Sequence, residues 1–134
     1  MRQLINRKNA AAWIAEEDGC PQGFAIVHWS KPSQGTPSDN SSSLESEDKL
    51  AAYIETIEVT PEARAQGAGR QLLDHVEDSA RQAGSVLIWL HVEAENEAAI
   101  RLYQTQGYSC KGRQDDYYPL GHAALIYVKR LKSR

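Results

Sequence analysis

The segment Arg64-Ala65-Gln66-Gly67-Ala68-Gly69 limits the possible folds of this 134-residue chain more than any other stretch does. Residues 50–59 before it are rich in apolar and β-branched side chains, which predicts a strand, and Thr60-Pro61 ends that strand. Residues 69–83 after it follow a helical period. Glycines in a strand-to-helix turn let backbone N–H groups approach an anion, and the helix N-terminus adds partial positive charge. The segment therefore predicts a phosphate-binding turn.

Two nucleotide-binding motifs do not fit this turn. A dinucleotide fingerprint needs a third glycine where Leu72 stands, and a P-loop needs Gly-Lys-Ser/Thr where the chain has Gly69-Arg70-Gln71. Arg64 adds a charge-assisted contact to the predicted phosphate site. Glycine turns before helices are also common without any ligand, so the turn gains specificity only from the residues that follow it.

The rest of the chain predicts a sheet of strands with two helices. Residues 12–15 and 24–29 flank a turn-forming stretch and predict a hairpin, whereas the first ten residues indicate a helix end or a loose lead-in. Residues 31–49 are rich in proline, serine and acidic side chains, which predicts a flexible hairpin loop. After the first helix we expect a buried strand, a second helix and two final strands, over residues 86–92, 96–106, 108–114 and 123–131.

Length and charge exclude several classes of protein. We expect one domain over residues 1–134, and the formal net charge of −3 lacks the basic footprint of nucleic-acid binding. No apolar run reaches the length of a membrane span, and the first residues do not resemble a secretory signal. Cys20 and Cys110 lie far apart, and the four histidines lack metal-ligand spacing. We therefore expect free thiols, a reducing cytoplasm and no metal site.

A second motif follows the turn at a fixed distance. The strand residues Leu90-His91-Val92 lead into Asn96, which is followed by Ala99, Leu102-Tyr103 and Gly107-Tyr108. This order, Arg-x-x-Gly-x-Gly, then a buried strand, then Asn-x-x-Ala-x-x-Leu-Tyr-x-x-x-Gly-Tyr, resembles the GNAT superfamily of acetyl-CoA-dependent N-acetyltransferases over residues 50–131.

The stretches Asp116-Tyr117-Tyr118-Pro119 and 121–127 are similar to those of the branch that acetylates protein N-termini, including the ribosomal-protein alanine acetyltransferases. The resemblance implies an α/β fold, a mixed and mostly antiparallel sheet flanked by helices. Family members usually begin with a strand and two helices, but this chain reaches its first hairpin by about residue 12. A shortened N-terminal part, in which much of one wall of the acceptor cleft is missing, is therefore expected. Two explanations of the missing wall stay open: the start of the chain is truncated, or another subunit completes the cleft, such as a second copy in a homodimer.

The resemblance also implies which residues bind acetyl-CoA as co-substrate. The backbone of the splayed strand would hold the acetyl and pantetheine parts, and the turn would hold the pyrophosphate. Asn96 would contact the pantetheine arm or act as a helix N-cap, which asparagine favours in any case. The implied cofactor-binding residues are Ile57, Glu58, Val59, Arg64, Ala65, Gln66, Gly67, Ala68, Gly69, Arg70 and Asn96.

Two residues match the family's catalytic positions. Tyr103 corresponds to the general acid that protonates or hydrogen-bonds the departing thiolate, although it is also placed to be a core aromatic. His91 stands where related enzymes carry a glutamate or histidine base. An imidazole of pKa about 6.5 suits an α-amine of pKa about 7.7–8.0 better than a lysine of about 10.4. A hydrogen-bonded strand histidine is the alternative, and Glu55, Glu58 and Glu93 remain other candidate bases.

Tyr117 and Tyr118 would line the acceptor side, or pack as an aromatic lid. Three functions stay open at this point. The first is acetyl transfer to a protein or peptide N-terminal amine by direct attack in a ternary complex. The second is the same chemistry on a small amine or a lysine, and the third is a non-catalytic acyl-CoA-binding module.

Overall fold

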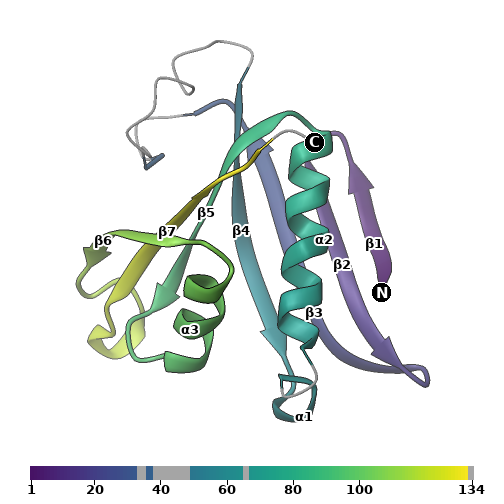
Figure 1. Cartoon of the computed structure of the whole chain (residues 1–134). Coiled ribbons are helices and arrows are strands. Elements are labelled where there is room, and N and C mark those ends of the chain that lie inside the picture. The colour runs from purple at the N-terminus through teal and green to yellow at the C-terminus, as the bar shows by residue number, and fades with distance from the viewer. Residues whose placement is uncertain (33–35, 38–48, 65–66, 133–134) are drawn as a thin grey trace.

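The computed structural model describes residues 1–32, 36–37, 49–64 and 67–132. Within them the strands form one sheet in the order β1-β2-β3-β4-β5-β7-β6, in which only the β4–β5 pair is parallel (Figure 1). The strands are β1 (Arg2–Arg7), β2 (Ala10–Glu17), β3 (Cys20–Ser30), β4 (Leu50–Val59), β5 (Ser85–Glu93), β6 (Ser109–Gln114) and β7 (Ala124–Arg130). The helices are α1 (Pro61–Arg64), α2 (Ala68–Gln82), α3 (Glu97–Thr105) and the 3-10 turn η2 (Pro119–Gly121). This mixed, mostly antiparallel α/β architecture is the fold class that the sequence predicts.

Strands β4 and β5 run together at one end and separate at the other. Their parallel pairing runs from Leu50–Ser85 to Tyr53–Trp89 and stops there, although both strands continue. At the same place Val27 pairs with Ile54 and Ile26 with Thr56, so Glu55 is an extra residue in β4. A bulge of this kind bends a strand and increases its twist. The sheet therefore opens between β4 and β5 beyond the bulge, as Figure 1 shows, and we call this opening the split.

The core lies between one face of the sheet and the two longer helices. Helix α2 places its apolar side chains three and four residues apart, and they are completely buried against β2 to β5: Leu72, Leu73, Val76 and Ala80. Each fully buried leucine of this kind contributes roughly 1.5–3 kcal/mol. Helix α3 adds Tyr103, with Ala99 and Leu102 packed around it, to the same core. Both helices consequently lie on the same face of the sheet (Figure 1).

One prediction about local structure is wrong. The first ten residues form β1, which pairs with β2 through the turn at Lys8-Asn9, instead of a helix end or a loose lead-in. Strand β1 lies at the sheet edge, and its described side chains are exposed, so the sequence carries no alternating pattern there. Strand β3 begins at Cys20, four residues before the predicted start at Phe24, and the other predicted strands and helices are confirmed to within about two residues. Most of the predicted 31–49 loop, residues 33–35 and 38–48, lies outside the described residues.

The opposite face of the sheet has a different character. No helix interrupts the chain between β1 and β2, so the helix pair that the resemblance implies before the first hairpin is absent from this connection. Aromatic side chains lie on this face, with His28, Tyr53, Trp89 and His91 in successive ring contacts. We call it the aromatic face. In the described part of the chain no helix is long and apolar enough to cross a membrane.

Candidate functional site

The predicted phosphate turn lies at the N-terminus of α2, beside the split. Gly67 has φ 80° and ψ 18°, a left-handed conformation that glycine adopts without strain. Because Gly67 has no side chain to cap the helix, the N–H groups of the first turn of α2 stay available to an anion. Arg64 donates through Nε to the carbonyl oxygen of Val59 at 3.1 Å, which holds the turn against the end of β4. Ala65 and Gln66 lie outside the described residues.

The other glycine of the turn allows two helices to approach each other. A Cβ added to Gly69 would lie 3.2 Å from Leu102 Cδ2 of α3. Asn96 caps α3, since its Oδ1 accepts a hydrogen bond from the N–H of Ala99 at 3.2 Å. The N-cap interpretation of Asn96 is therefore confirmed. Arg70 is exposed and Ala68 is buried.

The end of β4 offers backbone groups to the split. Residues 57–59 continue the antiparallel pairing with β3 through Gly23, Phe24 and Ala25. On the side toward β5 the described residues give them no strand partner. The side chains of Ile57 and Val59 pack on the core, whereas Glu58 is exposed. A bound ligand can therefore complete the unpaired edge with hydrogen bonds.

Tyr103 is buried, with 5% of its surface exposed. Its ring lies 5.6 Å from that of Tyr108 and 6.4 Å from that of Tyr127, measured between centroids. Burial, followed by the nearby Tyr118 phenol, raises the pKa of Tyr103 to about 12. Within the described part of the chain its hydroxyl has no hydrogen-bond partner. Tyr103 is thus both a core aromatic and a protonated phenol able to donate.

His91 is held through both ring nitrogens. The Tyr53 hydroxyl lies 2.8 Å from Nδ1, and Oε1 of Gln114 lies 2.7 Å from Nε2. The Tyr117 ring stacks on the imidazole at 4.3 Å, and its hydroxyl lies 3.4 Å from Nδ1. Burial, and then the Tyr117 phenol, raise the pKa of Tyr53, which keeps it protonated.

The two tyrosines predicted on the acceptor side continue the aromatic contacts of His91. The Tyr117 and Tyr118 rings are 4.9 Å apart and nearly perpendicular. Burial, then Tyr117 and Glu93, raise the pKa of the Tyr118 phenol. The ring contacts join Tyr118, Tyr117 and His91, and Tyr118 also contributes electrostatically to the raised pKa of Tyr103.

Sequence reasoning missed Tyr53 and Gln114. Tyr53 is part of the last β4–β5 pair, so it lies where the split begins. Gln114 ends β6, two strands away from β5 along the order β5-β7-β6. The polar end of β6 was the only sequence signal for Gln114, and strand pairing was needed to bring it to His91.

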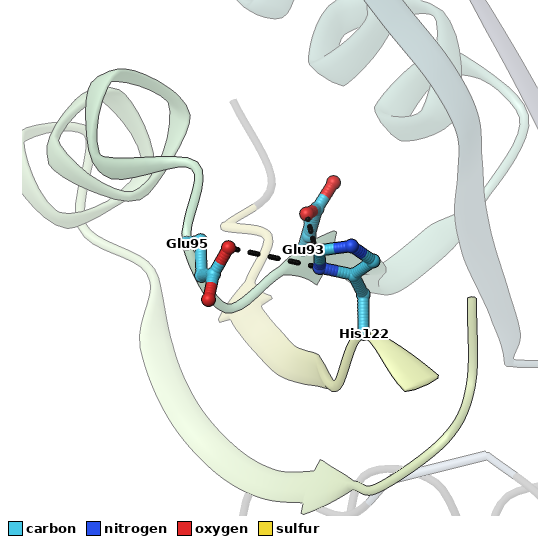
Figure 2. A group of neighbouring side chains, drawn as sticks. All are labelled: Glu93, Glu95 and His122. Atoms are coloured by element: carbon cyan, nitrogen blue, oxygen red, sulfur yellow. Dashed lines mark ion pairs between the residues drawn. The ribbon is translucent and has the colours of Figure 1, made fainter. Parts of the chain in front are cut away.

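Of the alternative bases, Glu93 is already engaged. Figure 2 shows Glu93, the last residue of β5, and Glu95, in the turn after it, directed at His122, at 3.0 and 3.6 Å from its Nδ1. These three side chains offer ligand atoms within 4.8 Å of one another. Histidine spacing in the sequence did not indicate this group, because only one of its members is a histidine and the carboxylates come from a distant segment. Glu55 and Glu58 are exposed on β4.

A cavity of about 420 Å³ lies elsewhere, between α2 and strands β1 to β3. Trp13, Trp29, His75 and Ser79 are among its lining residues, and the indole of Trp13 donates to Ser79 Oγ at 2.9 Å. None of the predicted site residues lines it.

A sheet split beside a glycine turn, with a tyrosine and a histidine at the opening, defines the class of an acyl-CoA-dependent transferase fold. The chain belongs to the acetyltransferase (GNAT) family, whose model matches residues 1–108. The resemblance seen in the sequence is therefore confirmed.

Two curated relatives act on different acceptors by name. The chain is 36% identical over 98 residues to the ribosomal protein bS18-alanine N-acetyltransferase of Salmonella typhimurium, covering 63% of this chain and 66% of that protein. It is 40% identical over 101 residues to the streptothricin acetyltransferase of Streptomyces lavendulae, covering 75% and 45%. The chain thus spans about half to two thirds of the length of these relatives.

The fold also matches a solved structure. The crystal structure of the ribosomal-protein-S18-alanine N-acetyltransferase from Escherichia coli superposes with a TM-score of 0.71 at 26% identity. The match covers 96% of this chain and 74% of that one.

Proposed function

We propose that this chain transfers an acetyl group from acetyl-CoA to a primary amine, and that the amine is the N-terminal α-amine of a protein or peptide. The observation that carries the proposal is the split between β4 and β5, with His91 bonded to Tyr53 where the split begins and the Gly67 turn at the start of α2. The similarity to the ribosomal protein bS18-alanine N-acetyltransferase supports the α-amine, and the similarity to a second acetyltransferase supports acetyl transfer in general.

The residues present fit acetyl-CoA. The edge of residues 57–59 that has no strand partner among the described residues suits the amide groups of the pantetheine arm. The N–H groups of Ala68, Gly69 and Arg70 in the first turn of α2 suit a pyrophosphate. Arg64 and Arg70 are exposed at the same turn and add positive charge. When bound, acetyl-CoA supplies a thioester carbonyl for attack and a thiolate leaving group. The chain's own residues then have to bind, orient and move protons.

His91 accepts the proton of the amine in this proposal. An amine attacks only when neutral, and Nδ1 of His91 faces the Tyr53 hydroxyl at 2.8 Å. The Tyr53 oxygen takes the amine proton while its own proton passes to Nδ1, so two protons shift, the net transfer is one proton from amine to His91, and Tyr53 remains a phenol. Histidine, with an ordinary pKa of about 6.5, suits an α-amine of about 7.7–8.0, which favours α-amines over lysine.

Tyr103 assists the leaving group. A phenol with a pKa of about 12 is a weaker acid than a thiol of about 8.5, so the raised pKa favours a hydrogen bond to the sulfur over complete proton transfer. Acetyl-CoA on the helix side and the acceptor on the aromatic face reach the split from opposite sides. This arrangement supports direct attack in a ternary complex, with Tyr117 and Tyr118 lining the acceptor side.

A small amine or a lysine is the second candidate acceptor. The 40% identity to streptothricin acetyltransferase favours a small amine. The direct β1–β2 connection favours it too, because the acceptor cleft then has less surface to bind a peptide. A non-catalytic acyl-CoA-binding module is the third candidate. We further propose that residues 1–134 form one acetyltransferase domain. The free thiols of Cys20 and Cys110 are consistent with a cytoplasmic location. A second copy of the chain in a homodimer would supply the missing wall of the acceptor cleft.

One experiment separates these candidates. The chain is incubated with acetyl-CoA and a panel of peptides with free N-termini, N-terminally blocked lysine peptides and small amines, and products are read by mass spectrometry. Acetylation of peptide α-amines supports the proposal. Acetylation of small amines or blocked lysine peptides alone overturns the α-amine assignment. Binding of acetyl-CoA without any product overturns the enzymatic one.

A further inference from the structure

We propose that Gln114 is a positioning residue that fixes the tautomer of His91 and so directs the basic nitrogen, Nδ1, toward Tyr53 and the split. The proposal rests on the proposed function of His91 as proton acceptor. It assigns a role to a residue that lies outside both motifs of the sequence.

The strand order explains how a residue of β6 reaches His91. Strand β7 lies between β5 and β6, and Ala124 of β7 pairs with both Gln114 and Glu93. The methyl side chain of Ala124 leaves room above the sheet for the longer glutamine to cross. The amide then meets the imidazole, with Oε1 at 2.7 Å from Nε2.

The two bonds of His91 depend on each other. A neutral imidazole carries one N–H donor and one acceptor nitrogen, and its tautomer decides which is which. An amide oxygen can only accept, so its contact with Nε2 requires the proton to be on Nε2. Nδ1 then has a free lone pair, which meets the Tyr53 hydroxyl at 2.8 Å and the Tyr117 hydroxyl at 3.4 Å.

This tautomer is the one that the proposed reaction needs. Only Nδ1 faces Tyr53 and, through it, the split, whereas Nε2 faces β6. When Nδ1 gains a proton, the Nε2–H bond to the Gln114 oxygen persists and steadies the imidazolium. The opposite tautomer would place a proton on Nδ1 before the reaction and leave no acceptor for the amine proton.

The tautomer can be measured without any acetyl transfer. Protein labelled with ¹⁵N at histidine gives two-bond ¹⁵N–¹H correlation spectra in which protonated and unprotonated ring nitrogens separate. The test compares the wild-type chain, Gln114→Leu, Gln114→Glu and the control Lys111→Leu, an exposed residue of the same strand. Each is measured at a pH where His91 is neutral.

We expect Nε2–H in the wild type, in Lys111→Leu and in Gln114→Glu, which keeps an accepting oxygen. Gln114→Leu should show a mixture of tautomers. A wild-type His91 with its proton on Nδ1, or a tautomer unchanged in Gln114→Leu, overturns the proposal.

A kinetic measurement links the tautomer to turnover. With an acceptor found in the panel, Gln114→Leu should lower kcat by about tenfold or more with little change in the KM for acetyl-CoA, because proton transfer and not binding is impaired. Gln114→Glu should restore most of the rate. An unchanged kcat in Gln114→Leu overturns the positioning role. If the wild type acetylates nothing, the proposed function fails separately, while the spectra still decide the tautomer.

Discussion

Tyr103 illustrates how one residue can serve packing and chemistry together. Its ring belongs to the core beneath α2, and its hydroxyl lies free of hydrogen bonds within the described part of the chain. Burial that raises its pKa to about 12 keeps the phenol protonated at any physiological pH. An ordinary phenol is protonated at neutral pH as well, so the packing extends this donor state to more alkaline pH.

Replacing Tyr103 by phenylalanine tests the donor role. Tyr103→Phe keeps the ring and removes the hydroxyl, so kcat should fall by about 10²-fold while the Kd of acetyl-CoA stays nearly constant. Steady-state kinetics and calorimetric titration measure the two quantities. Tyr108→Phe is the matched control, because its hydroxyl bonds to Glu77 and not to the split. Equal turnover in Tyr103→Phe and wild type would remove Tyr103 from the reaction.

Substitutions at Gly67 test the left-handed backbone conformation of the turn without adding a steric clash. A Cβ at this position would meet no atom within 4 Å, so Gly67→Ala adds no clash. The φ of 80° nevertheless disfavours alanine, and we expect the free energy of unfolding to fall by about 1 kcal/mol. Gly67→Asn should lose less, since asparagine tolerates this region. Urea denaturation of the three proteins decides the point, and an alanine variant as stable as wild type would contradict it.

The sequence anticipated some site residues and not others. Tyr103, His91, Asn96 and the glycines belong to short motifs whose spacing is fixed within one element, so one sequence suffices to find them. Tyr53 and Gln114 become neighbours of His91 only through the pairing of separate strands. Local periodicity contains no information about such pairing.

At the scale of elements, α2 is tied to the C-terminal strands by a buried carboxylate. Glu77 is 3% exposed and accepts hydrogen bonds from the Tyr108 hydroxyl at 2.8 Å and from Lys129 Nζ at 2.9 Å. Arg81 adds a contact at 3.4 Å from the next turn of the helix. Burial, and then Glu77, raise the pKa of Tyr108. Because the β4–β5 ladder is short, this group helps to hold α2 against β7.

Removing Glu77 should therefore be costly. Glu77→Ala leaves Lys129 and the buried Tyr108 hydroxyl without their partner, and we expect a loss of about 3 kcal/mol in the free energy of unfolding. Asp74→Ala, an exposed acid on the same helix, should change it by less than about 0.5 kcal/mol. Chemical denaturation monitored by circular dichroism compares the two. Similar losses for both variants would show that the group contributes nothing specific.

Elements with one buried face could be predicted, whereas the exposed edge could not. Strands β4 and β5 and helix α2 bury side chains at regular intervals, and their predicted bounds are confirmed within about two residues. Strand β1 has exposed side chains along its described length, so its pairing with β2 left no sequence pattern. The split itself depends on a one-residue register shift, which sequence periodicity does not reveal.

At the scale of the whole molecule, buried phenols set the behaviour in alkali. The pKa of Tyr103 is about 12 in the folded chain, against 10.0 for an ordinary tyrosine. Between these values the unfolded chain loses the Tyr103 proton and the folded chain keeps it. The contribution of Tyr103 to the free energy of unfolding is therefore fully present below pH 10 and declines as the pH rises. A single tyrosine of this kind contributes a slope of about 1.4 kcal/mol per pH unit.

Urea denaturation at pH 9, 10 and 11 should follow this expectation. The wild type should lose stability above pH 10, and Tyr103→Phe should lose less per pH unit, by about 1 kcal/mol. Tyr108 contributes in the same direction, because burial also raises its pKa. A slope that is the same in Tyr103→Phe and wild type would show that Tyr103 titrates alike in both states.

The extra residue in β4 has a consequence for how such a fold changes over generations. Inserting or deleting one residue in a strand normally turns every following side chain to the wrong face. At Glu55 the reverse holds, because Ile54 and Thr56 already face opposite sides and would alternate correctly without it. Loss of that single codon would leave the core side chains in place while removing the bend that opens the sheet. A single deletion during evolution would therefore close the split in one step. A homologue that folds but is inactive would be recognised by the absence of this residue.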